Sequence, residues 1–187
     1  MSPLRFTAKT LLAALSLAGS LACAPRTSLE PLAPGSSPVF ASMVRGGRGG
    51  PNYSLRVHDD WTVDFQGHRH PEQPVLYAKW KLTEVQMFEL RKLLGKFGER
   101  AGVAGLDCAA APDAATTTIS YELGETKWTL AHNLSCMTPQ ARELVPLEFR
   151  FDKVVESERV IGSLAPFRNL ILERMEQAQA REQRAAE

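Results

Sequence analysis

The chain has 187 residues, of which 44% are hydrophobic and 23% are charged, and its formal net charge is +1. This length suits one sizeable hydrophobic core, and this composition excludes a wholly disordered chain. The near-neutral charge argues against a nucleic-acid-binding surface or a polybasic membrane-binding surface. The sequence therefore predicts one globular domain, with no nucleic acid among its partners.

Residues 1–22 have the pattern of a secretory signal peptide. Arg5 and Lys9 give a basic start, and the uncharged apolar run TLLAALSLAGSL follows. This run is shorter than the roughly 20 apolar residues that a membrane-spanning helix needs. A cleavable signal peptide is therefore expected, and with it export from the cytoplasm.

The residues Ser20-Leu21-Ala22-Cys23 resemble a bacterial lipobox, in which a small residue precedes a cysteine that receives a lipid. Ser20 departs from the leucine that is usual at its position, and ordinary signal-peptidase cleavage after Ala22 or Ala24 is the alternative. We expect Cys23 to be acylated and to anchor the protein to the lipid bilayer of the cell envelope. Because Ala24 and not Asp follows Cys23, the expected address is the outer membrane, facing the periplasm.

Residues 23–38 are rich in Pro, Ser and Ala and have no periodicity, which predicts a flexible tether. A folded domain is expected over residues 39–162, and it begins with a strand at 39–44. Two β-hairpins are predicted from alternating apolar and polar residues. The first joins 53–58 to 61–66 through Asp59-Asp60, and the second joins 116–123 to 126–132 through Gly124-Glu125. The side chains expected on their inner faces are Tyr53, Leu55, Val57, Trp61, Val63, Phe65, Ile119, Tyr121, Leu123, Trp128 and Leu130.

A helix is predicted between the hairpins, after a short extended segment at 75–82. The residues Thr83-Glu84-Val85-Gln86 form a capping box, and Gly98 offers a stop. Apolar residues repeat at helical spacing between these two points. They are Val85, Phe88, Leu90, Leu93, Leu94 and Phe97.

Two further helical segments are predicted after the second hairpin. Thr138-Pro139 starts the first, and Pro146 is expected to restart it. Its apolar stripe comprises Leu147, Phe151, Val154 and Val155. Ser163 is expected to cap a C-terminal helix within 163–187, whose end after Glu176 is expected to be solvated and frayed. The buried side of this helix is expected to hold Phe167, Leu170, Ile171 and Met175.

This order of elements predicts an α+β fold: an antiparallel sheet built from two β-hairpins plus an N-terminal strand, with helices packed on one face. Cys108 and Cys136 flank the second hairpin. In an oxidising envelope compartment this pair predicts a disulfide. A metal pair or a catalytic thiol is the alternative.

The segment 45–67, RGGRGGPNYSLRVHDDWTVDFQG, combines a Gly-rich loop, Pro-x-Tyr, a strand, an acidic turn and a second strand that ends in aromatic-x-Gly. The positions in step are Gly49, Pro51, Tyr53, Val57, Asp60, Val63, Phe65 and Gly67. On these residues the chain resembles the bacterial domain of unknown function 6438 family, over roughly residues 39–160. The family commonly has two cysteines in the loop, where this chain has Arg48 and Gly50. The resemblance implies the fold and the envelope address, and it supplies no activity.

His58, His68 and His70 are the candidate metal ligands, because the spacing His68-Arg69-His70 places two imidazoles on one side of an extended segment. Further ligands would have to come from residues such as Asp59, Asp60 or His132. A polar surface loop is the alternative interpretation, and we favour it.

Other motifs predict no chemistry. The Gly-rich segment 46–50 lacks the Lys-Ser/Thr of a phosphate-binding loop, and the sequence contains no Gly-x-Ser-x-Gly. Asp59, Asp60 and Asp64 are expected to be solvated carboxylates. Trp61 and Trp128 are expected in the core, and Trp80 is expected to be partly exposed.

No catalytic residue and no cofactor is therefore predicted. The leading hypothesis is an envelope lipoprotein whose domain is a non-enzymatic binding or structural module, with an envelope protein or a glycan as its partner. The alternative is a metal-binding protein or hydrolase that uses the His58/His68/His70 region.

Overall fold

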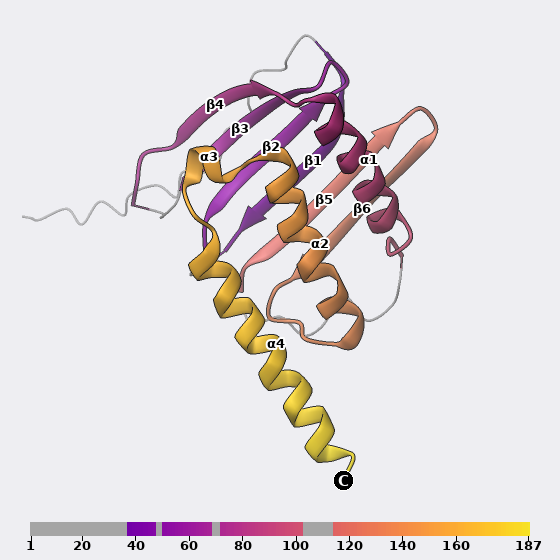
Figure 1. Ribbon diagram of the computed structural model, residues 1–187, viewed down its shortest axis with the longest axis vertical. Helices are drawn as coiled ribbons and strands as arrows, with labels where there is room; N and C mark the ends of the chain where they lie inside the picture. The colour runs from indigo at the N-terminus through magenta and orange to yellow at the C-terminus, as the bar shows by residue number, and fades with distance from the viewer. Residues whose placement is uncertain (1–36, 48–49, 69–71, 103–113) are drawn as a thin grey trace, which may run out of the picture.

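The computed structural model describes residues 37–47, 50–68, 72–102 and 114–187 of the chain. These residues form an antiparallel six-stranded sheet, with α1 and α2 against one of its faces and α4 running beside α2 and past the sheet (Figure 1). The α+β fold predicted from the sequence is thus confirmed. The strands, in the spatial order β4-β3-β2-β1-β5-β6, are β1 (Val39–Gly46), β2 (Asn52–His58), β3 (Thr62–His68), β4 (Leu76–Lys81), β5 (Thr116–Leu123) and β6 (Thr126–Asn133).

β1 joins the two hairpins, because it pairs with β2 on one side and with β5 on the other. Met43 lies opposite Leu55 of β2 and Ile119 of β5, and all three side chains are fully buried. Side chains alternate across a strand, so Ala41 and Arg45 face the helices together with Met43. A charged residue of β1 therefore points into the layer between sheet and helices.

The first hairpin is confirmed, with one correction at its turn. Asp59, Asp60 and Trp61 form a three-residue loop, in which Trp61 has φ 70° and donates its N–H to the His58 carbonyl at 2.9 Å. Such loops end in a residue with a left-handed backbone, which takes it out of the following strand. The prediction that Trp61 lies in the core is therefore wrong, and its side chain is 37% exposed.

The second hairpin is also confirmed, and its strands are in register from Thr116 opposite Asn133 to Leu123 opposite Thr126. Ile119 and Leu130 are buried, while Tyr121 and Trp128 are partly buried against the core. Leu123 is 50% exposed, contrary to the prediction. It lies next to the Gly124 turn, where no helix packs on the strands in the described part of the chain (Figure 1).

Helix α1 (Glu84–Gly98) begins with the predicted capping box. The Thr83 side chain accepts from the Gln86 N–H, and the Gln86 side chain accepts from the Thr83 N–H at 2.8 Å. The predicted buried face is only partly right, because Val85 and Phe88 are 72% and 66% exposed. The face that packs on the sheet instead comprises Met87, Leu90, Leu93, Leu94 and Phe97.

Helix α2 (Pro139–Val155) starts at Thr138-Pro139, as predicted, with Thr138 as its N-cap, but it runs without interruption through Pro146. The prediction that Pro146 restarts the helix is therefore wrong. Pro146 is exposed, so solvent can hydrate the backbone carbonyl that loses its helical donor at this position. A single long helix thus covers the centre of the sheet.

The short helix α3 (Glu158–Ile161) leads into α4 (Ala165–Ala185). The prediction that Ser163 caps α4 is wrong, because the N-cap residue is Leu164, whose side chain cannot accept a hydrogen bond. The Ser163 hydroxyl accepts from the Ala165 N–H at 3.2 Å. Phe167 and Ile171 are buried as predicted, whereas Leu170 is 41% exposed. The helix continues past Glu176 to Ala185.

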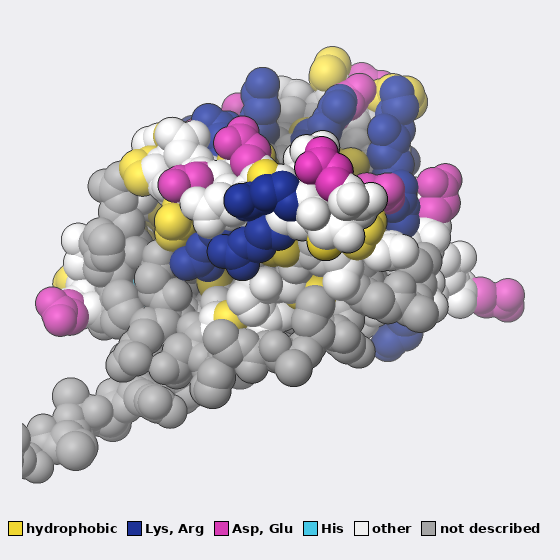
Figure 2. Space-filling view, turned by 90° about the horizontal axis from the view of Figure 1, so that it is seen from below, with side chains coloured by type: hydrophobic (Ala, Val, Ile, Leu, Met, Phe, Trp, Pro, Cys, Tyr) yellow, Lys and Arg dark blue, Asp and Glu magenta, His cyan; other side chains and the backbone are white. Residues whose placement is uncertain are grey.

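The end of the molecule at which α4 emerges carries basic and acidic side chains next to one another (Figure 2). Mixed charges of this kind are typical of a solvated helix. No helix in the described ranges has the length and apolar character needed to cross a membrane.

Candidate functional site

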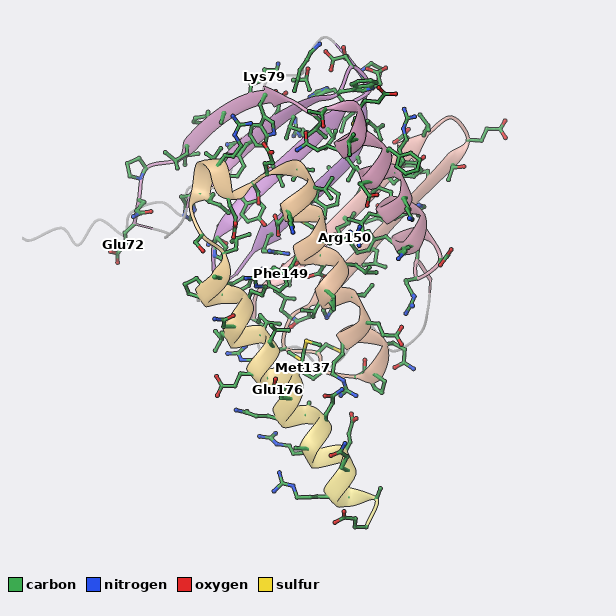
Figure 3. The ribbon with its side chains drawn as sticks, viewed as in Figure 1. Glu72, Lys79, Met137, Phe149, Arg150 and Glu176 are labelled. Atoms are coloured by element: carbon green, nitrogen blue, oxygen red, sulfur yellow. The ribbon has the colours of Figure 1, made fainter. Side chains whose placement is uncertain are left out.

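Helix α2 has a different environment on each of its sides. Phe149 lies on the side of α4, where its ring centroid is 6.1 Å from that of Phe167, and Arg150 lies on the side of α1, where its Nη2 donates to Glu89 at 2.6 Å (Figure 3). Glu148 and Asp152 lie on a third side and are buried against the sheet. The side chains of α2 that could perform chemistry are therefore divided between a buried side and a solvent side.

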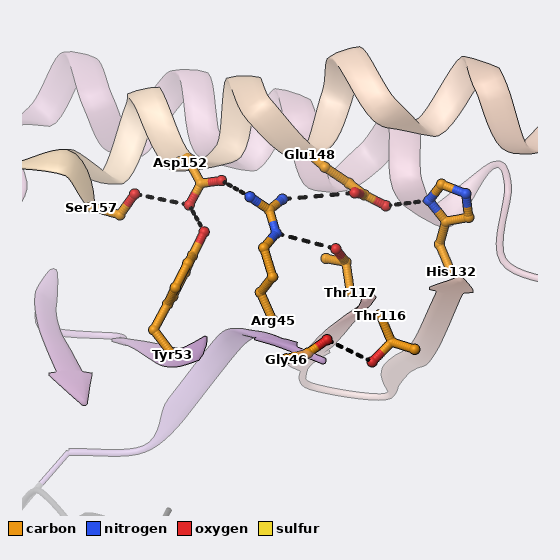
Figure 4. A network of polar contacts seen from close by, with 9 residues as sticks. All are labelled: Arg45, Gly46, Tyr53, Thr116, Thr117, His132, Glu148, Asp152 and Ser157. Carbon is orange, nitrogen blue, oxygen red and sulfur yellow. Dashed lines mark hydrogen bonds and ion pairs between the residues drawn. The ribbon is translucent and has the colours of Figure 1, made fainter. Parts of the chain in front are cut away.

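Arg45 of β1 binds α2 through a buried polar cluster (Figure 4). Its Nη1 donates to Asp152 Oδ2 at 2.7 Å, and its Nη2 lies 3.7 Å from Glu148 Oε2. Its Nε donates to the Thr117 hydroxyl of β5 at 3.3 Å. The Arg45 side chain is 0% exposed, so the guanidinium relies entirely on these partners and on the rings around it.

The two carboxylates extend the cluster to further elements. Asp152 Oδ1 accepts from the Tyr53 hydroxyl of β2 and from the Ser157 hydroxyl, the latter at 2.9 Å. Glu148 Oε1 lies 2.7 Å from His132 Nδ1 of β6. The cluster defined by Arg45, Tyr53, Thr117, His132, Glu148, Asp152 and Ser157 therefore ties α2 to four strands of the sheet.

Three aromatic rings surround the Arg45 guanidinium. Its central carbon lies 5.1 Å from the Phe149 ring centroid, 5.6 Å from that of Phe167 and 5.7 Å from that of Tyr53. A guanidinium within about 6 Å of a ring centroid is attracted by the negative face of the ring. Because Phe167 belongs to α4, Arg45 also stabilises the position of that helix.

Burial and neighbouring charges shift the pKa values of the cluster in opposite directions. Burial by itself would lower the pKa of Arg45, but Asp152, Tyr53 and Glu148 outweigh it and hold that pKa above its ordinary value. Burial raises the pKa of the Asp152 carboxyl, and Arg45 together with the hydroxyl donors offsets only part of the rise. Burial also raises the pKa of Tyr53 well above 10.0, so its hydroxyl stays protonated and donates to Asp152.

The cluster has the geometry of a structural anchor. Each of its side chains is at most 2% exposed, so a dissolved substrate has no access to them. Among the described residues, three of its buried atoms have no hydrogen-bond partner: Arg45 Nη2, Glu148 Oε2 and His132 Nε2. Groups that could perform acid–base chemistry are therefore used to hold α2 on the sheet.

Two signals in the sequence could have predicted this cluster, although the expected sites did not include it. The alternation of β1 continues from Ala41 and Met43 to Arg45, which places the arginine on the inner face. Glu148 and Asp152 are four residues apart and interrupt the apolar stripe of α2. An arginine and two acidic residues at such core positions indicate a buried ion pair, because isolated buried charges are rare.

The solvent side of α2 carries an open groove of about 940 Å³, which lies between the start of α1 and helix α4. Both apolar and charged side chains line it. The apolar side chains are Val85, Pro146, Phe149, Val154, Leu164 and Leu172. The charged side chains, apart from the buried Asp152, are Glu89, Arg150, Lys153, Glu158 and Arg168.

The candidate histidines that the structure describes, His58 and His68, do not converge. His58 and His68 are at opposite ends of the β2–β3 hairpin, which is about 20 Å long at about 3.3 Å per residue. Both ring nitrogens of His58 are in contact, Nδ1 with the Ser37 carbonyl at 2.7 Å and Nε2 with Asp64 at 2.9 Å. His132 belongs to the buried cluster on the other face of the sheet, and His70 lies outside the described residues. Within the described ranges, no three His, Cys, Asp or Glu residues are arranged to hold a metal ion.

The prediction for Asp64 is wrong, whereas the prediction for Trp80 is confirmed. Asp64 was expected to be solvated, but it is 7% exposed and contacts both His58 and Lys79. Trp80 is partly buried against the core, and its indole N–H donates to the Val155 carbonyl at 3.0 Å. The edge strand β4 is thereby bound to the end of α2.

The predicted lipidation site Cys23 lies outside the described residues, as does Cys108. Cys136 is described, and it is 1% exposed just before α2. The lipid anchor and the Cys108–Cys136 disulfide thus stay predictions.

Comparisons with known proteins give no further guidance, since no protein-family model and no curated protein matches the chain. The resemblance to the domain of unknown function 6438 family accordingly stays a prediction from the residues between Arg45 and Gly67.

Proposed function

We propose that this protein is an exported lipoprotein, anchored to the envelope through Cys23, whose domain binds another envelope component without catalysing a reaction. The observation that carries the proposal is the contrast between the two sides of α2. The ionisable groups best suited to chemistry are buried around Arg45, whereas the open side carries a large groove. The groove is the binding surface in this proposal.

The composition of the groove supports recognition of a macromolecule. Apolar side chains such as Val85 and Leu172 lie beside charged ones such as Lys153, and all three are exposed. Apolar surface supplies the affinity of most protein interfaces, and charges around it supply specificity and fast association. The buried cluster supports the same function, because it fixes α2, which forms the floor of the groove, and Arg45 also contacts α4 through Phe167.

The address is tested by Cys23→Ser. We expect this substitution to abolish palmitate labelling and to release the protein in soluble form, because the thiol is the acceptor of the lipid. Labelling and membrane fractionation of cells measure both effects. A variant that is still labelled, or that stays membrane-bound without processing, contradicts the anchor at this position.

Binding through the groove is tested by photo-crosslinking in intact cells. A photoreactive residue at Lys153 or Leu172 is expected to give a discrete adduct with one envelope component. The matched control is the same residue at Thr129, which is exposed on β6 away from the groove. Adducts of equal yield from all three positions, or no adduct from the groove, contradict the proposal.

A further inference from the structure

We infer that the groove on α2 binds an acidic amphipathic helix of a protein partner, and that Lys153 and Arg168 select its charge. The inference rests on the proposed binding function and adds to it the chemistry of the partner. It follows from the excess of basic over acidic side chains in the groove, from the position of its apolar side chains and from its form.

Each acidic side chain on the solvent side of the groove accepts a hydrogen bond within the protein. Glu89 accepts from Arg150 at 2.6 Å, and Glu158 accepts from the backbone N–H of Leu164 at 2.6 Å. Lys153 and Arg168 are both exposed, and neither makes a side-chain ion pair or hydrogen bond with another residue in the described ranges. Arg150 neutralises Glu89, and Lys153 and Arg168 outnumber the one remaining acidic side chain, Glu158. The groove is therefore positive by one formal charge, and a complementary partner is acidic.

Apolar side chains occupy both margins of the groove. Val85 of α1 is 72% exposed and Leu172 of α4 is 38% exposed, while Pro146 of α2 lies between these helices. A partner that contacts them must present apolar side chains on one face and acidic ones beside it. Amphipathic helices bind grooves in this manner, through anchors spaced three and four residues apart.

The form of the groove favours a rod-shaped partner. Its lining residues come from α1, α2, α3 and α4, so the groove is an open depression between helices. A flat bilayer surface, the other anionic amphipathic structure of an envelope, fits such a site less well than a rod does.

The test uses the full exported chain with Cys23→Ser and two labelled helical peptides. Both peptides carry leucines at positions i, i+3, i+4 and i+7, and they differ in having either Glu or Lys on the flanks. Fluorescence anisotropy is expected to show binding of the Glu peptide, weakening as salt is added, and no comparable binding of the Lys peptide. Lys153→Glu with Arg168→Glu should weaken the Glu peptide at least about tenfold and strengthen the Lys peptide, because like charges then face each other.

The matched control is Arg91→Glu with Arg174→Glu, which changes the net charge equally at exposed positions of α1 and α4 outside the groove. A second groove variant, Lys153→Gln with Arg168→Gln, is expected to weaken binding of the Glu peptide without adding negative charge. Thermal unfolding verifies that each variant is folded. Equal weakening by the control pair overturns the inference, as does failure of the Glu peptide to bind.

Vesicles of anionic phosphatidylglycerol separate a lipid partner from a protein partner. Vesicle binding that depends on Lys153 and Arg168, in the absence of peptide binding, overturns the inference in favour of a lipid headgroup. If groove crosslinks form in cells but the Glu peptide does not bind, the proposed binding function stands and only the acidic helix is rejected.

Discussion

The Arg45 side chain connects β1 to three other elements of the fold. It contacts β5 through Thr117, α2 through Asp152 and α4 through Phe167. These contacts need the planar guanidinium, whose nitrogens point in different directions and whose face lies against aromatic rings. Lysine has one compact charge and cannot reproduce them. The contacts at this buried position therefore require both the charge and the planar shape of arginine.

Asp152→Asn is expected to lower the free energy of unfolding by about 3 kcal/mol. Removing one partner of a buried ion pair typically costs about 3–5 kcal/mol, and the lower end applies because Glu148 still lies 3.7 Å from Arg45. Urea unfolding followed by circular dichroism measures the change. Lys153→Gln is the control, since this neighbouring side chain is exposed and its loss should change stability by no more than about 0.5 kcal/mol. Equal effects of the two substitutions contradict the role of the cluster.

Helix α2 is the element on which both sides of the candidate site depend. Its buried side carries the carboxylates that face Arg45, and its solvent side lines the groove. Pro146 lies inside this helix, where it removes one backbone hydrogen bond and lowers helix stability. The helix persists because its apolar stripe is packed against the sheet, which outweighs the local propensity.

Pro146→Ala is consequently expected to stabilise the protein, by about 1–3 kcal/mol, since proline is about 3 kcal/mol less favourable than alanine in a helix interior. Pro146 is exposed, so the substitution leaves no cavity in the core. Thermal unfolding measures the shift, and Pro139→Ala provides the comparison, because proline is tolerated in the first turn of α2. A loss of stability with Pro146→Ala would show that the helix requires the proline.

The end of α4 is held by a two-point contact with the start of α2. Arg142 Nη1 and Nη2 donate to the two Glu182 oxygens at 2.9 and 2.7 Å, and Nη1 also donates to the Met137 carbonyl at 2.7 Å. The hydrogen bonds from Arg142 lower the pKa of Glu182 below its ordinary 4.5. A lowered folded-state pKa means that the contact stabilises the docked helix above pH 4.5, and that this stabilisation is lost as the pH falls through the folded-state pKa.

NMR titration of the Glu182 carboxyl is expected to give a midpoint below 4.5, the ordinary value for a glutamate side chain. Arg142→Gln should return the Glu182 midpoint to the ordinary value. If Arg142→Gln leaves the midpoint unchanged, the contact is not formed in solution.

At the scale of the whole molecule, the two hairpins are joined through β1 and covered by helices that come from both halves of the sequence. α1 follows the first hairpin and α2 follows the second, and the two helices are linked by the Arg150–Glu89 ion pair. The groove therefore exists only when both halves are folded together. Any covalent link near the second hairpin would restrict the unfolded chain and stabilise this arrangement.

The predicted Cys108–Cys136 disulfide is such a link. We expect thiol titration of the unfolded, unreduced mature protein to detect no free thiol. We also expect reduction to lower the free energy of unfolding by about 3 kcal/mol, because the loop that the disulfide closes restricts the unfolded chain. Cys136 is buried beside the start of α2, so the effect should appear in the unfolding of the whole domain. Two free thiols would contradict the disulfide and would reopen a metal or redox role for the pair.

The sequence by itself determined the elements whose signals are local. Alternation along Asn52–His58 and Thr62–His68 was enough for the first hairpin, and the Thr83–Gln86 capping box was enough for the start of α1. These signals lie within a few residues of one another, so neighbouring side chains alone decide them. The buried side of α1 was predicted only in part, because Val85 and Phe88 continue its apolar pattern but lie on its exposed side.

Only the tertiary structure decided the candidate site. Arg45 and Asp152 are 107 residues apart in the chain and meet because β1 occupies the centre of the sheet beneath α2. The groove is likewise formed by side chains of α1, α2 and α4, and Lys153 and Arg168 acquire a common role there. Such sites depend on long-range packing, in which a charged side chain is buried or exposed according to partners that no local pattern of residues specifies.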